Sequence, residues 1–101
     1  MKNTTGQEVL SLQKEGKKVL IDLWAPWCGP CKTLIPRLEN IDPKYDNVEF
    51  VKINVDEEKS YAQGLGIRSI PTVLIFDGEQ EVGRLTGVQP DTEYFKILDN
   101  L

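Results

Sequence analysis

The pattern of apolar and polar positions divides the chain into eight predicted elements. Apolar runs rich in β-branched residues predict strands, and apolar positions three and four apart predict helices that cover a sheet. The predicted order is α-β-α-β-α-β-β-α, over residues 5–15, 19–24, 30–41, 48–56, 57–65, 72–76, 81–86 and 90–101. The chain contains no internal repeat or low-complexity tract. We therefore expect a single α/β domain over residues 1–101.

The predicted connections define a mixed sheet. Residues 19–24 are apolar at every position except Asp22, which is typical of a central strand covered on both faces. The helix over 30–41 makes a crossover to 48–56, so these two strands should be parallel. Asp77 and Gly78 predict a tight turn between two antiparallel strands.

The segment before the first helix is too short and too polar to predict a strand. Residues 1–5 contain no apolar alternation. We therefore expect four strands. In the first helix, Val9, Leu10 and Gln13 are expected on one buried stripe, and Asp56 is expected to cap the helix over 57–65.

Composition excludes several classes of partner. The chain has 12 Lys and Arg against 16 Asp and Glu, a net charge of -4, and its basic residues are scattered. Nucleic acid and anionic membranes are not expected as partners, because phosphate recognition needs clustered cations. No apolar run approaches membrane-spanning length, and no apolar segment follows Lys2. We expect a monomer in the cytoplasm.

The two cysteines are the main candidates for chemistry. A zinc site needs two more ligands than Cys28 and Cys31 supply, and the chain has no histidine, so no metal site is expected. In a reducing compartment a C-x-x-C pair is more typical of catalysis than of a structural staple. Cys28 falls where a helix begins, and the free N–H groups there favour a thiolate, so Cys28 is the predicted nucleophile. Cys31 lies one turn later on the same face and is the predicted resolving thiol.

Asp22 and its neighbours suggest further roles. Because its neighbours in the strand are apolar, Asp22 is predicted to be buried with a raised pKa and to take the proton of Cys31 through a water; the alternative is a carboxylate that reaches solvent at a frayed edge. Trp24 falls on the face of Asp22, whereas Trp27 is predicted as exposed contact surface. Lys52 is either a solvated lysine or the partner of Asp22.

One stretch of sequence resembles a known family. Residues 24–32 read W-A-P-W-C-G-P-C-K, and together with Asp22 and the triplet Ile70-Pro71-Thr72 they are similar to the thioredoxin family. The resemblance implies a thioredoxin-like fold, with a mixed sheet flanked by helices on both faces. It also implies general reduction of protein disulfides without a bound cofactor. The implied partners are a thioredoxin reductase, which supplies electrons from NADPH or another source, and disulfide-containing client proteins.

The same resemblance implies roles for individual residues. It makes Cys28 the attacking cysteine and Cys31 the buried resolving one, and it pairs Asp22 with Lys52 on the next strand. Gly29 and Pro30 complete the active-site motif. The residues implied to form the rim where a substrate segment docks are Trp27, Ile70, Pro71 and Gly87. The bond between Ile70 and Pro71 is implied to be cis.

The sequence departs from the family pattern at three places. Leu23 stands where an aromatic residue is common, which is a tolerable change in a core. Ser69 and Thr86 stand where the family often has a glycine and an aliphatic residue, so the docking groove should be more polar. The third departure is the missing first strand, and the resemblance then implies that residues 48–55 form an exposed edge of the sheet.

Two hypotheses about function remain at this stage. The first is a dithiol-disulfide exchanger that reduces client disulfides, with an oxidase or isomerase as variants of the same chemistry. The dipeptide Gly29-Pro30 resembles the reducing members. The second is an accessory binding subunit, in which the fold serves as a protein clamp and the thiols are incidental.

Overall fold

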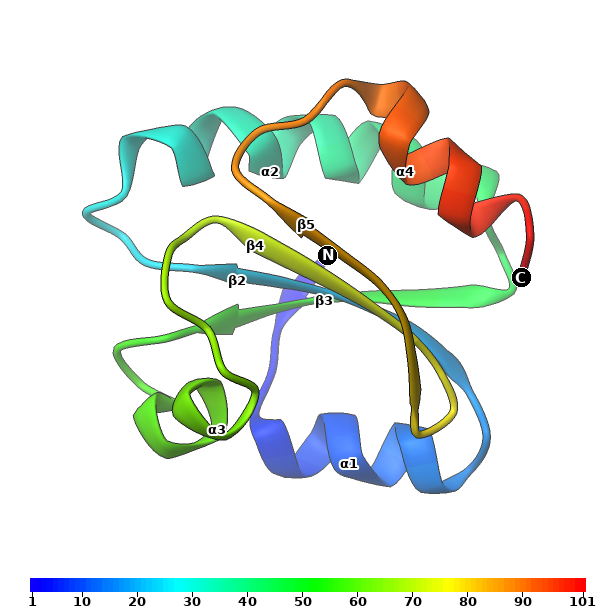
Figure 1. The fold of residues 1–101 in the computed structure, drawn as a ribbon, viewed down its shortest axis with the longest axis horizontal. Coiled ribbons are helices and arrows are strands. Elements are labelled where there is room, and N and C mark those ends of the chain that lie inside the picture. The colour runs from blue at the N-terminus through cyan, green and yellow to red at the C-terminus, as the bar shows by residue number, and fades with distance from the viewer.

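A mixed sheet of five strands lies between two helical layers in the computed structural model, which describes residues 1–101 (Figure 1). The strand order is β1-β3-β2-β4-β5. Helices α2 and α4 cover one face of the sheet, and α1 and α3 cover the other (Figure 1). The elements are β1 (Lys2–Asn3), α1 (Gly6–Lys14), β2 (Lys18–Trp24), α2 (Gly29–Ile41), the 3-10 turn η1 (Asp42–Lys44), β3 (Val48–Asn54), α3 (Lys59–Gly64), β4 (Thr72–Asp77), β5 (Gln80–Thr86) and α4 (Asp91–Leu98).

Strand β2 is the centre of the sheet. It pairs in parallel with β3, as the sequence predicts, and antiparallel with β4. Its alternate residues Val19, Ile21 and Leu23 belong to the buried cluster beneath α1 and α3. Leu20 lies in the cluster beneath α2 and α4, and Asp22 follows it on the same face. The Asp22 carboxyl therefore lies on the face of the sheet that α2 covers, and the two cysteines lie at the start of α2.

Strand β1 corrects the prediction of four strands. Lys2 and Asn3 pair in parallel with Val51 and Lys52 of β3, and the Thr4 amide donates to the Lys52 carbonyl at 2.9 Å. The middle of β3 is therefore not an exposed edge. A strand of two residues is too short to show the alternation from which strands are recognised.

Helix α2 is amphipathic, as predicted. It buries Leu34, Leu38 and Ile41 against the sheet. Arg37 ties it to the segment that opens α4, because its Nε donates to Asp91 Oδ1 at 2.9 Å. The Arg37 guanidinium also donates to the carbonyl oxygen of Gln89.

Two predictions about the other helices are wrong. In α1 the buried residues are Gly6, Val9 and Gln13, whereas Leu10 is 48% exposed. Asp56 does not cap α3, which begins only at Lys59. None of the helices is both long and apolar enough to cross a membrane.

Candidate active site

The two cysteines lie at the N-terminus of α2 and form a disulfide. Cys28 is the N-cap residue, and its extended backbone turns into the helix at Gly29 and Pro30. The Cα atoms of Cys28 and Cys31 are 5.3 Å apart. The Cys31 amide donates to Cys28 Sγ at 3.2 Å, so one of the free N–H groups of the first turn points at this sulfur. This is the arrangement that stabilises negative charge on Cys28 when the bond is reduced.

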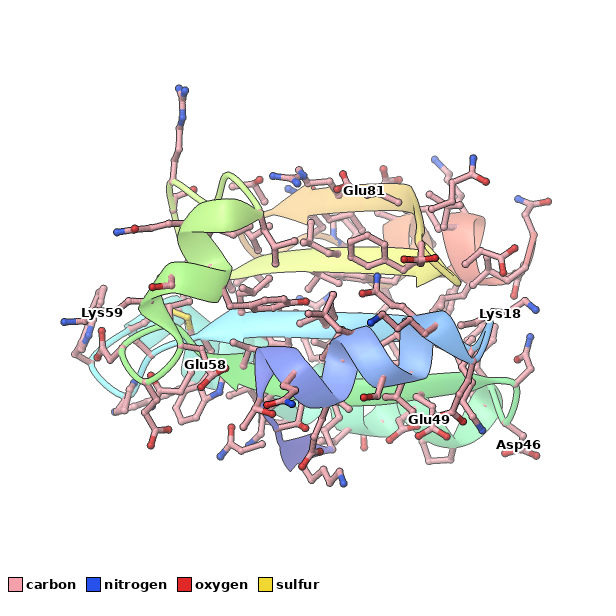
Figure 2. All side chains as sticks on the ribbon, turned by 90° about the horizontal axis from the view of Figure 1, so that it is seen from below. Lys18, Asp46, Glu49, Glu58, Lys59 and Glu81 are labelled. Carbon is pink, nitrogen blue, oxygen red and sulfur yellow. A yellow bond between two sulfur atoms is a disulfide. The ribbon has the colours of Figure 1, made fainter.

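The two cysteines differ only slightly in exposure. Cys28 is 5% exposed and Cys31 is fully buried. Both pack with Ala25, and the half-buried Trp24, Val55 and Ile70 surround them. Figure 2 shows the disulfide at the same end of the molecule as Glu58 and Lys59, away from Lys18 and Asp46. A partner can therefore reach Cys28 only at this end and only at the surface around it.

Asp22 is fully buried, which confirms the prediction. Neither of its carboxyl oxygens has a hydrogen-bond partner within the chain. Burial raises the pKa of Asp22 from 3.8 to about 7, while the charge of Lys52 opposes this rise. Asp22 can therefore exchange a proton near neutral pH.

Lys52 lies beside Asp22 but does not bind it directly. The two residues are opposite each other in the parallel register of β2 and β3. The Lys52 ammonium lies over the Trp24 ring, 5.2 Å from the centroid, within the range of a cation–π interaction. The ammonium is therefore held against the Trp24 ring, and it acts on the Asp22 carboxyl through its charge without pairing with it.

Trp27 is the most exposed large apolar side chain near the cysteines, with 70% of its surface accessible. Its Nε1 donates to Asp56 Oδ2 at 2.9 Å, which fixes the ring over the end of β3. The Asp56 amide donates in turn to Asn54 Oδ1 at 2.9 Å. A side chain that is exposed yet held in one orientation is suited to contact a partner.

The segment before β4 and the segment after β5 lie side by side. The bond between Ile70 and Pro71 is cis, as the resemblance implies. The Gly87 amide donates to the Pro71 carbonyl at 2.8 Å, and Gly87 has a φ of 77°, a conformation that favours glycine. The structure thus places Ile70, Pro71 and Gly87 together.

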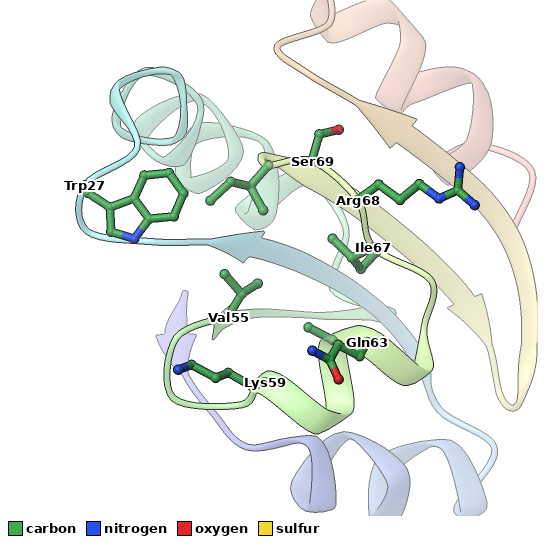
Figure 3. Close-up of a pocket in the computed structure, with 9 residues that line it drawn as sticks. Trp27, Val55, Lys59, Gln63, Ile67, Arg68 and Ser69 are labelled. Carbon is green, nitrogen blue, oxygen red and sulfur yellow. The ribbon is translucent and has the colours of Figure 1, made fainter.

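A pocket of about 390 Å³ opens between Trp27, α3 and the segment that leads into β4 (Figure 3). Five of its nine lining residues are hydrophobic, and Lys59, Arg68 and Gln63 bring polar groups to it. Ser69, one of the two residues expected to make the docking groove more polar, lines this pocket. The lining residues are Trp27, Val55, Lys59, Ala62, Gln63, Ile67, Arg68, Ser69 and Ile70.

Sequence reasoning missed some of the residues around the site. Asn3 accepts a hydrogen bond from Trp24 Nε1 at 3.0 Å, although it lies 21 residues away in the chain. The sequence predicts Asp56 as a helix cap and not as the partner of Trp27. No local pattern distinguishes these partners, because each contact depends on how distant strands are aligned.

Comparisons with known proteins agree on one family. The sequence model described as Thioredoxin matches residues 3–100. Thioredoxin 1 of Synechococcus elongatus is 45% identical over 97 residues, which cover 95% of this chain and 88% of that protein. Thioredoxin 1 of Nostoc sp. is 42% identical over 98 residues, covering 96% of this chain and 89% of that protein.

Solved structures agree with the sequence relatives. The structure of mitochondrial thioredoxin 3 from Saccharomyces cerevisiae in its oxidized form superposes with a TM-score of 0.86 at 34% identity, covering 98% of this chain and 93% of that one. Thioredoxin from Halobacterium salinarum gives a TM-score of 0.86 at 27% identity, covering 99% and 88%. The predicted fold class and the predicted thiol-disulfide chemistry are confirmed. The chain belongs to the thioredoxin family of protein-disulfide reductases.

Proposed function

We propose that this protein reduces client disulfides with Cys28 as the nucleophile and Cys31 as the resolving thiol. The observation that carries the proposal is the position of the Cys28–Cys31 disulfide at the N-terminus of α2, where Cys28 is the N-cap residue and Cys31 lies deeper. A thiolate at the helix start is stabilised by the free N–H groups of the first turn. The deeper thiol is held one turn away, within reach of the first sulfur.

The reaction transfers two electrons from the reduced pair to the client. The Cys28 thiolate attacks one sulfur of the client disulfide, and the other client sulfur leaves as a thiolate that takes a proton from solvent. The Cys31 thiol then loses its proton, and its thiolate attacks Cys28 Sγ. This step forms the Cys28–Cys31 disulfide and releases the second client sulfur as a thiolate.

Asp22 is the proposed acceptor of the Cys31 proton. Its carboxyl is buried and has no hydrogen-bond partner in the chain, and burial raises its pKa to about 7. A base whose pKa is near the working pH is efficient, because it is both ionised often enough and basic enough. The proton passes through a water, and Lys52 supports the ionised form of Asp22.

The proposed client surface is the rim around Cys28. Trp27 supplies an exposed ring held by Asp56. Ile70, Pro71 and Gly87, which lie together, supply the rest of the rim. Gly29 and Pro30, the first two residues of α2, are proposed to set the redox balance toward reduction.

The wider cellular role forms part of the same proposal. We assign the electrons to an external thioredoxin reductase that uses NADPH, and the clients to proteins with accessible disulfides. The support for these partners is the family, whose members carry electrons between a reductase and substrates. We place the protein in the cytoplasm as a single-domain monomer, because a reductase needs a compartment that keeps its thiols reduced.

Trapping of mixed disulfides tests the assigned roles. The Cys31→Ser variant should attack clients but not release them, so client complexes that dissolve in reducing agent should accumulate. The matched variant Cys28→Ser should accumulate few or none. Equal trapping by both variants would contradict the roles, and a client bound equally by the double serine variant would favour the binding-subunit hypothesis. The reduction potential, measured against glutathione, separates a reductase from an oxidase.

A further inference from the structure

The two-residue strand β1 reaches the active site through one side chain. Asn3 Oδ1 accepts a hydrogen bond from Trp24 Nε1 at 3.0 Å, and Asn3 lies opposite Lys52 in the parallel register of β1 and β3. The Thr4 amide donates to the Lys52 carbonyl at 2.9 Å. The backbone of β1 is therefore fixed beside Lys52, and its side chain is fixed to Trp24.

Trp24 connects this contact to the surroundings of Asp22. Trp24 follows Asp22 by two residues on β2, so both side chains lie on the same face of the sheet. The Lys52 ammonium lies over the Trp24 ring at 5.2 Å, although Lys52 is opposite Asp22 in the register of β2 and β3. Neither Asp22 oxygen accepts a hydrogen bond from it. The ring therefore holds the ammonium near the carboxyl but out of contact with it.

We propose that Asn3 is a positioning residue of the active site, which fixes the Trp24 ring and through it the place of the Lys52 ammonium beside the Asp22 carboxyl. This inference rests on the proposed function of Asp22 as proton acceptor. A lysine side chain that is not held moves its strongly hydrated ammonium toward water, and the fully buried Asp22 cannot follow it. The held ammonium favours the ionised carboxylate, so Asn3 sets the pH at which Asp22 takes up a proton.

The other titratable groups near Asp22 come from the two helices that cover this face. Tyr94 on α4 is fully buried; burial raises the pKa of Tyr94, and the charge of Asp22 adds to this rise. Helix α2 contributes the two cysteines, which do not titrate while they form the disulfide. Burial raises the pKa of Asp22, and Lys52 is the one charged group that lowers it. A measurement on the oxidised protein therefore reports on the position of Lys52.

The test is a pH titration of the Asp22 side-chain carboxyl by carbon-13 NMR on the oxidised protein. In the Asn3→Ala variant the midpoint should rise by roughly 0.5 pH unit, because the attraction between the Lys52 ammonium and the Asp22 carboxyl is weakened. The rise should be smaller than in Lys52→Met, and Asn3→Ala should add nothing in the Lys52→Met background. Lys2→Ala is the matched control, because Lys2 lies on the same strand but its side chain pairs with Glu8 of α1.

The outcomes separate the possible explanations. A midpoint that stays or falls in Asn3→Ala, or that rises equally with and without Lys52, would overturn the proposal. Loss of exchange protection at the Thr4 amide would assign the effect to detachment of β1 and would also overturn it. The pH profile of mixed-disulfide release tests the proposed function separately. A shifted midpoint with an unshifted profile would support the positioning by Asn3 and refute Asp22 as the proton acceptor.

Discussion

Replacing Asp22 with asparagine should stabilise the oxidised protein, and the gain should depend on pH. Burial raises the pKa of Asp22 from 3.8 to about 7, against the opposing charge of Lys52. At pH values between these two pKa values, the folded protein therefore keeps a proton on Asp22 that the unfolded chain has lost. The stability that this proton contributes is complete below about pH 4, declines as the pH rises, and is lost above about pH 7.

The size of the effect follows from the two pKa values. Their difference of about 3 pH units corresponds to about 4 kcal/mol in the free energy of unfolding. Asparagine has nearly the same shape but carries no charge to bury. We expect Asp22→Asn to be more stable than the wild type by up to about 4 kcal/mol near pH 8, and to differ little from it near pH 3.5.

Urea denaturation of the oxidised proteins at both pH values measures this difference. The matched control is Asp46→Asn, at an exposed position in the turn before β3, which should change stability by less than about 0.5 kcal/mol at either pH. A gain for Asp22→Asn of the same size at both pH values, or a loss near pH 8, would show that the carboxyl does not bury an uncompensated charge. The same variant should release mixed disulfides more slowly near neutral pH.

Substitutions at four further positions test other parts of the structure. Gly83→Ala should destabilise the fold by about 1–3 kcal/mol in urea denaturation, because the new Cβ would lie 2.6 Å from Ile97 Cδ1, and Ile97→Val should restore part of the loss. Gly64→Ala is the matched control, because the new Cβ would meet no atom within 4 Å, and it should stabilise α3 by about 0.5–1 kcal/mol; a loss of stability would reveal an unrecognised contact. Trp27→Ala should raise the KM for protein disulfides roughly fivefold or more while sparing small disulfide reagents, and equal effects on both would argue against docking. Arg37→Ala should lower stability by about 1 kcal/mol in thermal unfolding, and Arg37→Lys should restore only part of this if the paired hydrogen bonds matter.

The elements that the sequence predicts well are those with a strong local signal. The apolar run around Asp22 identifies β2 as central and predicts the burial of Asp22, because few strands tolerate one carboxyl among apolar residues unless it has a role. Cys28 is predictable in the same way, since its place before Gly29-Pro30 coincides with a helix start. These signals come from residues that are close together in the chain, so they can be recognised without knowledge of the fold.

The elements that the sequence does not predict depend on distant alignment. Strand β1 is only Lys2–Asn3, which is too short to show alternation, and it is recognised only by its pairing with the edge of β3. Asp56 has the residue type of a helix cap, yet the structure uses it to hold Trp27. Leu10 fits an amphipathic stripe by spacing, but only the direction in which α1 crosses the sheet decides that it faces solvent.

The closeness of the two cysteines in the chain has a thermodynamic consequence for the whole molecule. Their disulfide closes a ring of only four residues, Cys28 to Cys31. By the chain-entropy relation, closing such a small ring raises the free energy of the unfolded chain by about 2 kcal/mol, compared with about 3 kcal/mol for a ring of 15 residues. Making and breaking the bond therefore changes the free energy of unfolding by only a modest amount. Each cycle of electron transfer should therefore shift the stability of the fold only by this amount.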